Sequence, residues 1–119
     1  IIDPSALVSS SAKTGTGTFV ARNVSVNALA DIGTGVILNT SSVVEHECTI
    51  GDFSHIAPGA VLAGNVIVGK GSFIGANSVV KEGITIGDNV IIGAGSVVIK
   101  DVPDGCTVLG NPGRIIKRK

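Results

Sequence analysis

Large aromatic side chains are almost missing from this sequence of 119 residues. It contains three Phe and no Trp, Tyr or Met, so aromatic residues make up only 3% of the chain. Ordinary globular cores gain much of their buried area from such rings. The hydrophobic fraction is nevertheless 44%, and 17 residues are Gly. This composition argues against an irregular core of large side chains and favours a narrow, regular core of Ile, Val, Leu and Ala.

The chain also has no formal net charge, no long apolar segment and only two cysteines. Nine basic and nine acidic residues give a formal net charge of zero, so nothing global points to nucleic acid. No apolar run approaches the roughly 18 residues that a membrane-spanning helix needs. Cys48 and Cys106 are too few for a disulfide framework, and reduced thiols are typical of a cytoplasmic protein. We find no signal-peptide pattern, and the first residue, Ile1 instead of Met, leads us to expect a segment of a longer protein.

What the sequence does contain is a six-residue repeat that runs almost from end to end. Every sixth position from Ile2 to Val98 is aliphatic except Thr14, and the position four residues later is small or β-branched. A period of six does not fit one face of an α-helix with its 3.6 residues per turn. It fits short β-strands, in which positions separated by an even number share a face. Both positions are therefore predicted to point inward, with glycines at the bends.

Repeats such as Ile50-Gly51-Asp52-Phe53-Ser54-His55 and Ile74-Gly75-Ala76-Asn77-Ser78-Val79 resemble those of the hexapeptide-repeat acyltransferases, over about residues 2 to 113. The resemblance implies an all-β fold, a left-handed parallel β-helix of about six triangular coils with three hexads per coil. We expect this β-helix domain over residues 1–102, and a C-terminal coil with a basic tail over residues 103–119. Relatives of this type carry a nucleotide-sugar-binding domain ahead of the β-helix, which we expect to be absent from this chain.

Both histidines of the chain lie in one short stretch, and His46 has a carboxylate on each side, Glu45 and Glu47. The hexad register places His46 and His55 outside the prism, since the inward positions there are Val44, Cys48, Ile50 and Ser54. Cys48 is therefore expected to be a core thiol and not a nucleophile. An exposed imidazole can serve as a base near neutral pH, and a neighbouring carboxylate can hold its tautomer. Two ordinary surface histidines are the alternative interpretation.

The longer motif from Asn39 to His55 resembles the acetyltransferases of bacterial sugar-nucleotide and sialic-acid pathways, in particular the type that N-acetylates UDP-4-amino-sugars. This resemblance implies that His46 is the general base, that Glu47 polarises it, and that His55 contacts acetyl-CoA. The segment 62–66 also fits the family. It places Gly64 one coil beyond His46, where a backbone N–H can steady the carbonyl oxygen of a thioester.

Ala76 and Ala94 lie one coil apart in a column that starts at Pro58. Small side chains there leave a groove in which the pantetheine arm of acetyl-CoA can lie, although alanines merely tolerated at outward positions are the alternative. In the family this groove runs between adjacent subunits, so the resemblance implies a homotrimer in which half of each site comes from a neighbour. The chain ends in a basic tail that contains Arg114, Lys117, Arg118 and Lys119. This tail is expected either to bind the phosphates of coenzyme A or simply to be solvated.

The resemblance therefore implies an acetyl-CoA-dependent N-acetyltransferase that acts on a nucleotide-linked amino sugar, with no metal, nucleic-acid partner or membrane span. An O-acetyltransferase acting on sialic acid, serine or another small hydroxyl acceptor is the alternative, followed by a non-catalytic scaffold. A zinc enzyme on this fold, similar to the gamma-class carbonic anhydrases, needs three histidines per site, and the chain has two. An ice-binding solenoid should present a flat Thr-rich face, whereas the outward positions here are irregular.

Overall fold

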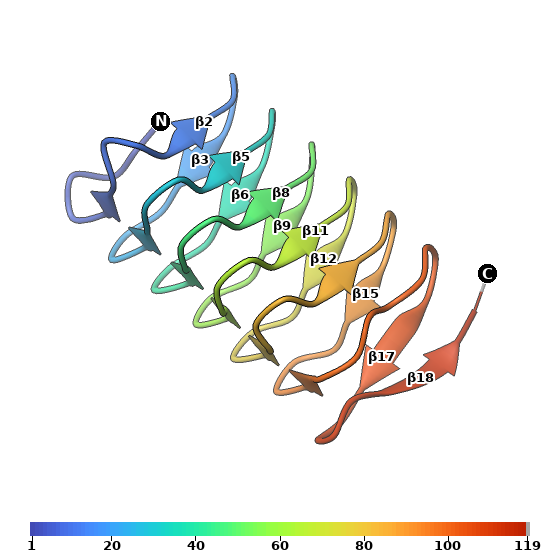
Figure 1. Cartoon of the computed structure of the whole chain (residues 1–119). Coiled ribbons are helices and arrows are strands. Elements are labelled where there is room, and N and C mark those ends of the chain that lie inside the picture. The colour runs from blue at the N-terminus through green and yellow to red at the C-terminus, as the bar shows by residue number, and fades with distance from the viewer. Residues whose placement is uncertain (119) are drawn as a thin grey trace.

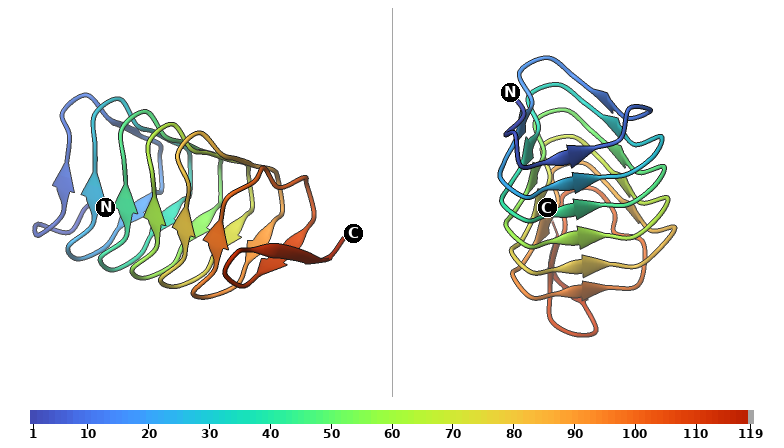
Figure 2. Two further views of the ribbon diagram at one scale, coloured as in Figure 1. Left: turned by 60° about the horizontal axis from the view of Figure 1, so that its bottom comes forward. Right: turned by 90° about the vertical axis from the view of Figure 1, so that its left-hand side faces the viewer.

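The computed structural model describes residues 1–118, which form a left-handed parallel β-helix (Figure 1). Successive coils stack along one axis, and the two termini lie at opposite ends of the stack (Figure 2). The molecule measures 38 × 22 × 20 Å. Among the described residues, no helix is long and apolar enough to span a membrane.

Each regular coil gives one two-residue strand to each of three sheets, which we name by their number of strands. The six-stranded face contains β1 (Leu7–Val8), β4 (Ser25–Val26), β7 (Val43–Val44), β10 (Val61–Leu62), β13 (Val79–Val80) and β16 (Val97–Val98). The five-stranded face contains β2 (Lys13–Thr14), β5 (Asp31–Ile32), β8 (Thr49–Ile50), β11 (Ile67–Val68) and β14 (Thr85–Ile86). The seven-stranded face contains β3 (Phe19–Val20), β6 (Ile37–Leu38), β9 (His55–Ile56), β12 (Phe73–Ile74), β15 (Ile91–Ile92), β17 (Thr107–Leu109) and β18 (Arg114–Lys117).

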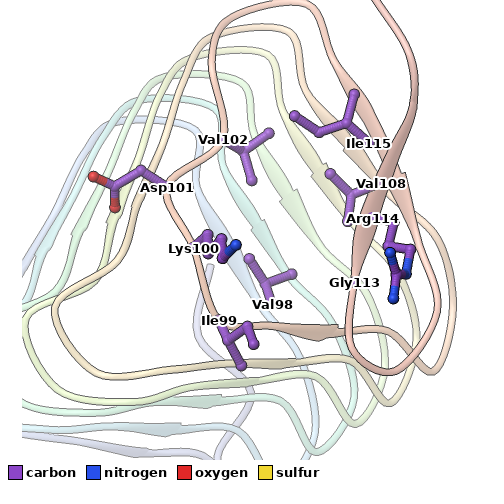
Figure 3. A pocket seen from close by; sticks show the side chains of 9 residues that line it. All are labelled: Val98, Ile99, Lys100, Asp101, Val102, Val108, Gly113, Arg114 and Ile115. Atoms are coloured by element: carbon purple, nitrogen blue, oxygen red, sulfur yellow. The ribbon is translucent and has the colours of Figure 1, made fainter.

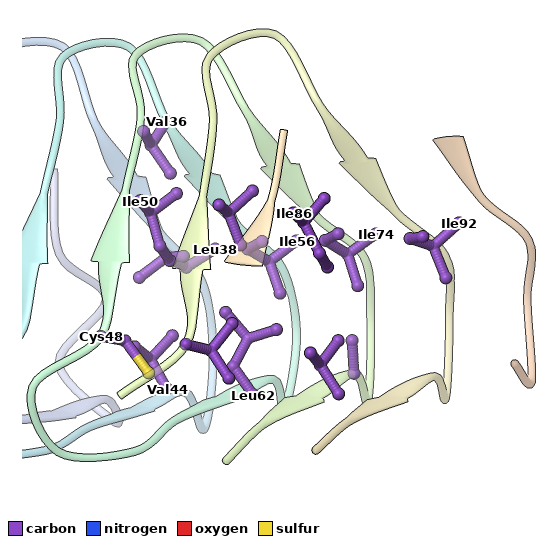
Figure 4. Packing of buried hydrophobic residues seen from close by; sticks show 14 of the residues in the cluster. Val36, Leu38, Val44, Cys48, Ile50, Ile56, Leu62, Ile74, Ile86 and Ile92 are labelled. Atoms are coloured by element: carbon purple, nitrogen blue, oxygen red, sulfur yellow. The ribbon is translucent and has the colours of Figure 1, made fainter. Parts of the chain in front are cut away.

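The core is a stack of aliphatic side chains inside the prism (Figure 4). Parallel pairs join residues 18 positions apart, for example Val44 with Leu62, so equivalent side chains of neighbouring coils lie on top of one another. The second residue of each β7, β8 and β9 strand is no more than 1% exposed. The positions four residues later are equally buried, among them Cys48 and Ser54. The predicted inward positions are confirmed from Thr18 onward, whereas Ile2 and Thr14, in the first coil of the stack, are exposed.

Turns between the faces form three corners, which position the outward side chains. The first corner joins the six-stranded face to the five-stranded face, for example at residues 45–48 between β7 and β8. The second corner joins the five-stranded to the seven-stranded face, as at residues 51–54. The third corner joins the seven-stranded face back to the six-stranded face, as at residues 57–60. In the triangular cross-section, the first corner therefore lies opposite the seven-stranded face.

Residues 103–118 depart from the coil that the sequence predicts over residues 103–119, and Lys119 lies outside the described residues. Bridged residues Ile86 and Val102 are 16 positions apart instead of 18, because the first corner of the last coil is two residues shorter. The core nevertheless continues, with Cys106 1% and Val108 2% exposed. Strand β17 pairs in parallel with β15, and β18 pairs antiparallel with β17. The prediction of coil is thus wrong for these two segments, since a strict count of six cannot follow a two-residue deletion.

Candidate active site

His46 and Glu47 form a hydrogen-bonded pair on the first corner. The Nδ1 atom of His46 lies 3.2 Å from Oε1 of Glu47, and the two side chains are 50% and 52% exposed. A carboxylate only accepts hydrogen bonds, so Nδ1 carries the proton and donates it to Glu47. The neutral ring therefore keeps its lone pair on Nε2. An exposed imidazole with a free Nε2 lone pair and a carboxylate behind Nδ1 has the arrangement that a general base requires.

Gly64 lies against this imidazole from the next coil of the same corner. A Cβ atom placed on Gly64 would be 2.5 Å from Nε2 of His46 and 2.7 Å from its Cε1. Side chains larger than a hydrogen atom would thus have to displace the ring. The two coils are also joined by a hydrogen bond of 3.0 Å from Asn65 N–H to the His46 carbonyl. The absence of a side chain at Gly64 therefore makes room for the His46 ring. The sequence predicts a second role for Gly64, in which its backbone N–H binds the carbonyl oxygen of the thioester.

Glu47 occupies a turn position that glycine and asparagine normally favour. Its φ of 62° lies in the left-handed region, which is costly for a residue with a Cβ atom. In the next two coils the equivalent position holds Asn65 with φ 59° and Gly83 with φ 77°. One coil before, the position holds Leu29 with φ 61°, so the left-handed turn is a general feature of this corner and Glu47 is one of the larger residues that it accommodates.

His55 lies elsewhere, at the start of β9 on the seven-stranded face. Its Nε2 atom is 3.1 Å from Nδ2 of Asn39, and its ring packs edge-on against Phe73, with centroids 5.1 Å apart and planes at 85°. Partial burial lowers the pKa of His55, which favours the neutral ring. Sequence analysis did not assign a role to Asn39. The available signal was that the equivalent positions of the neighbouring coils, Ala21 and Ala57, are both Ala.

Ala76 and Ala94 stack on the third corner, as the hexad register predicts. The N–H of Gly95 donates to the carbonyl of Ala76 at 2.8 Å, which sets the two coils in register. Ala94 is exposed and Ala76 is partly exposed, so both small side chains reach the surface. This corner borders the seven-stranded face that carries His55.

The prism therefore divides the predicted site residues into two groups. His46, Glu47 and Gly64 come together on the first corner. His55, Ala76 and Ala94 lie on the seven-stranded face and the adjoining third corner, on the opposite side of the triangle. In a single chain the two histidines face away from each other, so one chain alone does not assemble all six residues into one site.

A separate cavity of about 260 Å³ lies at the C-terminal end, between the last coil and the β17–β18 hairpin (Figure 3). Its lining is mainly aliphatic, with the charged residues Lys100, Asp101 and Arg114. None of the six predicted site residues borders it. Of the basic tail, residues 114, 117 and 118 are exposed, and Lys119 lies outside the described residues. Within residues 1–118, no group of three or more His, Cys, Asp or Glu side chains could hold a metal ion.

Known proteins share this architecture. The family described as hexapeptide repeat of succinyl-transferase matches residues 65–100. The acetyltransferase domain of PglB from Neisseria gonorrhoeae FA1090 is 41% identical with a TM-score of 0.96, over 98% of this chain and 57% of that chain. PerB from Caulobacter crescentus is 43% identical with a TM-score of 0.97, over 98% and 56%. By sequence and fold the chain is therefore similar to the hexapeptide-repeat acyltransferases.

A further member of the same structural group, WeeI from Acinetobacter baumannii AYE, is 33% identical with a TM-score of 0.93, over 97% of this chain and 57% of that chain. This hexapeptide-repeat chain thus spans a little more than half the length of the solved structures that it matches. Comparison with curated protein sequences gives no match.

Proposed function

We propose that this hexapeptide-repeat protein is an acetyl-CoA-dependent N-acetyltransferase that acetylates an amino group of a nucleotide-linked amino sugar. The observation that carries the proposal is the His46–Glu47 pair, which leaves Nε2 as a free proton acceptor on an exposed corner. Two similar structures support the choice of substrates. PerB was solved in complex with CoA and GDP-perosamine, and the PglB domain in complex with acetyl coenzyme A.

The reaction is a direct transfer with His46 as the general base. Nε2 of His46 takes a proton from the acceptor amine while the nitrogen attacks the acetyl carbonyl. A C–N bond forms, the C–S bond of the thioester breaks, and the coenzyme leaves as a thiolate that receives the proton. Glu47 holds the imidazole and stabilises its charged form. In this proposal the backbone N–H of Gly64 faces the carbonyl oxygen as negative charge develops on it.

The coenzyme contacts are assigned to His55, Ala76 and Ala94, so a complete site needs a second copy of the chain. The seven-stranded face supports such an assembly, because an exposed apolar column flanks His55. The exposed fractions are 43% for Phe19, 37% for Ile37, 39% for Phe73 and 49% for Ile91. We propose a homotrimer in which the first corner of one chain meets the seven-stranded face of the next. A cytoplasmic location is in keeping with the two free cysteines.

The reaction is tested by incubating the protein with acetyl-CoA and a UDP- or GDP-linked 4-amino sugar, and measuring thiol release and product mass. We expect transfer to the amino sugar and little transfer to serine or free sialic acid, which serve as hydroxyl-acceptor controls. Faster acetylation of a hydroxyl acceptor would overturn the N-acetyltransferase assignment.

The shared site is tested by subunit complementation. We expect His46→Ala to be almost inactive, and His55→Ala to be poorly active when acetyl-CoA is kept well below the KM of that variant. Co-expressed in equal amounts, they form mixed trimers in which some sites combine an intact first corner with an intact seven-stranded face. In a random mixture, half of the first corners and half of the seven-stranded faces are intact. About a quarter of the sites combine both, so about a quarter of wild-type activity should return. A mixture no more active than its two components, or a monomer in sedimentation at micromolar concentration, would contradict the shared site.

A further inference from the structure

Asn39 has two hydrogen-bonding groups that point in different directions. The residue is the first of the turn on the third corner that follows β6. Its Oδ1 atom accepts a hydrogen bond of 2.8 Å from the N–H of Thr40. Its Nδ2 atom lies 3.1 Å from Nε2 of His55, which starts the corresponding strand of the next coil. The contact with Thr40 settles which end of the amide is oxygen, so the NH₂ group is the end that faces His55.

This geometry decides where the proton of His55 lies. An amide NH₂ group can only donate, so Nε2 of His55 must accept and cannot carry a proton. The neutral ring then has its proton on Nδ1, and Nδ1–H is the donor that remains available. A protonated ring would set two N–H groups against each other at the Asn39 contact. The edge-on packing against Phe73 holds the ring plane in place.

We propose that Asn39 is a positioning residue that holds His55 in its Nδ1–H form, so that His55 donates a hydrogen bond from Nδ1 to an acceptor oxygen of acetyl-CoA. The part of this inference that concerns the coenzyme rests on the proposed function. The part that concerns the proton rests on the hydrogen bonds of Asn39 alone.

The third corner itself does not require asparagine at this position. The equivalent residues one coil before and one coil after are Ala21 and Ala57, which build the same turn without a side-chain amide. The Ala57 turn also keeps the backbone bond from Ala60 N–H to the Ala57 carbonyl, at 3.2 Å, as the Asn39 turn does from Ser42, at 3.0 Å. What distinguishes Asn39 from its neighbours is its contact with a histidine.

The sharpest variant is Asn39→Asp, because aspartate can still accept from Thr40 N–H while it replaces the NH₂ group by an oxygen. The carboxylate then needs a donor from His55, which moves the ring proton to Nε2. Asn27→Asp is the matched control. Asn27 holds the same turn position on the first corner, and its amide donates to the Val44 carbonyl at 3.3 Å and not to a histidine. Asn39→Ala removes the donor without adding charge and copies the residue found in both neighbouring coils.

The proton is located by two-bond ¹H–¹⁵N NMR spectra of the imidazole nitrogens at a pH of about 9, far above the ordinary pKa of an imidazole. We expect His55 to have a protonated Nδ1 in the wild type and in Asn27→Asp, and a protonated Nε2 in Asn39→Asp. This measurement needs no ligand. A wild-type His55 with its proton on Nε2 would overturn the inference whatever the protein catalyses.

Binding is measured by calorimetric titration with acetyl-CoA at the same pH. The loss of one hydrogen bond should raise Kd about tenfold in Asn39→Asp and Asn39→Ala, and less than about twofold in Asn27→Asp. Equal affinities of Asn39→Ala and the wild type would overturn the role of Asn39 in coenzyme binding. If the wild type itself does not bind acetyl-CoA, the proposed function is wrong, and the position of the His55 proton still decides whether Asn39 controls the ring.

Discussion

The hydrogen bonds of the two histidines of this chain favour the same tautomer but leave opposite groups exposed. On the first corner, Nδ1 of His46 donates to Glu47, and the lone pair of Nε2 remains free. On the seven-stranded face, Nε2 of His55 accepts from Asn39, and the N–H of Nδ1 remains free. The partner that occupies one ring nitrogen thus determines what the other can do. A carboxylate partner leaves a proton acceptor, and an amide partner leaves a proton donor.

Their surroundings differ in the same sense. His46 is half exposed and stands beside a glycine, which leaves space for an acceptor to approach Nε2. His55 is partly buried in an apolar column, which lowers its pKa, and its ring packs edge-on against Phe73, which fixes the orientation of the ring. The hexad scaffold fixes where each histidine lies, and the side chain bonded to one ring nitrogen, Glu47 or Asn39, determines which group the other nitrogen offers.

The largest effect is expected for the base itself. His46→Ala should lower kcat for transfer to the amino-sugar acceptor by about 10²–10⁴-fold, the usual value of a positioned general base. The melting temperature should barely change, because the side chain faces outward. Steady-state kinetics and a thermal melt of the same preparation check both points. Full activity in this variant would remove His46 from the mechanism.

Gly64→Val should displace the base without removing it. The new side chain would occupy the space of the His46 ring, and a displacement of about 1 Å can cost roughly 10²-fold in rate. Ala28→Val, on the same corner one coil before His46, is the control and should retain activity. A rise in the KM for acetyl-CoA at unchanged kcat would mean that Gly64 contributes to binding the thioester and not to the placement of His46.

Glu47→Asn separates activity from stability. Rate should fall about tenfold, since the imidazole loses its charged partner. The free energy of unfolding should rise by roughly 0.5–1 kcal/mol, because asparagine tolerates the left-handed turn better, as Asn65 does in the next coil. Denaturant unfolding and kinetics together test the pair of opposite changes. A variant less stable than the wild type would show that the turn is not strained by Glu47.

His55→Ala should act on coenzyme binding and not on proton transfer. We expect the KM for acetyl-CoA to rise several-fold, with a smaller change in kcat. A kcat loss as large as that of His46→Ala, at unchanged KM, would mean that the two histidines do not have the separate uses described above.

The smallest effect concerns pH. Burial lowers the pKa of His55 in the folded chain, whereas in the unfolded chain it stays near 6.5. Below about pH 6.5 the unfolded state therefore binds a proton at His55 more readily than the folded state does. The free energy of unfolding of the wild type falls as a result. Between pH 8 and pH 5 the melting temperature of the wild type should fall by about 1–2 °C more than that of His55→Gln. Parallel curves for the two proteins would contradict the burial effect.

The left-handed triangular β-helix was implied by the family resemblance, whereas the six-residue period was sufficient to predict short β-strands and their inward positions. This is because the core is a column in which each aliphatic residue contacts its equivalent one coil away, so that spacing alone defines contact. The outward orientation of His46 and its proximity to Gly64 followed from the same count. The roles assigned to these residues came from family resemblance and remain predictions.

Other features could not be read from the count. Asn39 and His55 are 16 positions apart in the sequence. Their contact depends on the directions of two side chains that come from neighbouring coils. The shortened corner before Val102 breaks the six-residue period. The strands that follow it, β17 and β18, could therefore not be predicted by counting in sixes. The separation of the two histidine groups follows from the triangular cross-section, in which nine residues carry the chain from a corner to the opposite face.

The antiparallel β18 has a consequence for how copies of this chain meet end to end. A parallel solenoid offers unpaired N–H and C=O groups at its last coil, and another chain can pair with them and extend the stack into a filament. On the seven-stranded face, β18 occupies that edge and runs against the direction of the other strands. Its exposed side chains include Arg114 and Lys117, which repel an identical strand. The hairpin thus terminates the solenoid on this face and disfavours fibre growth by end-to-end pairing of coils.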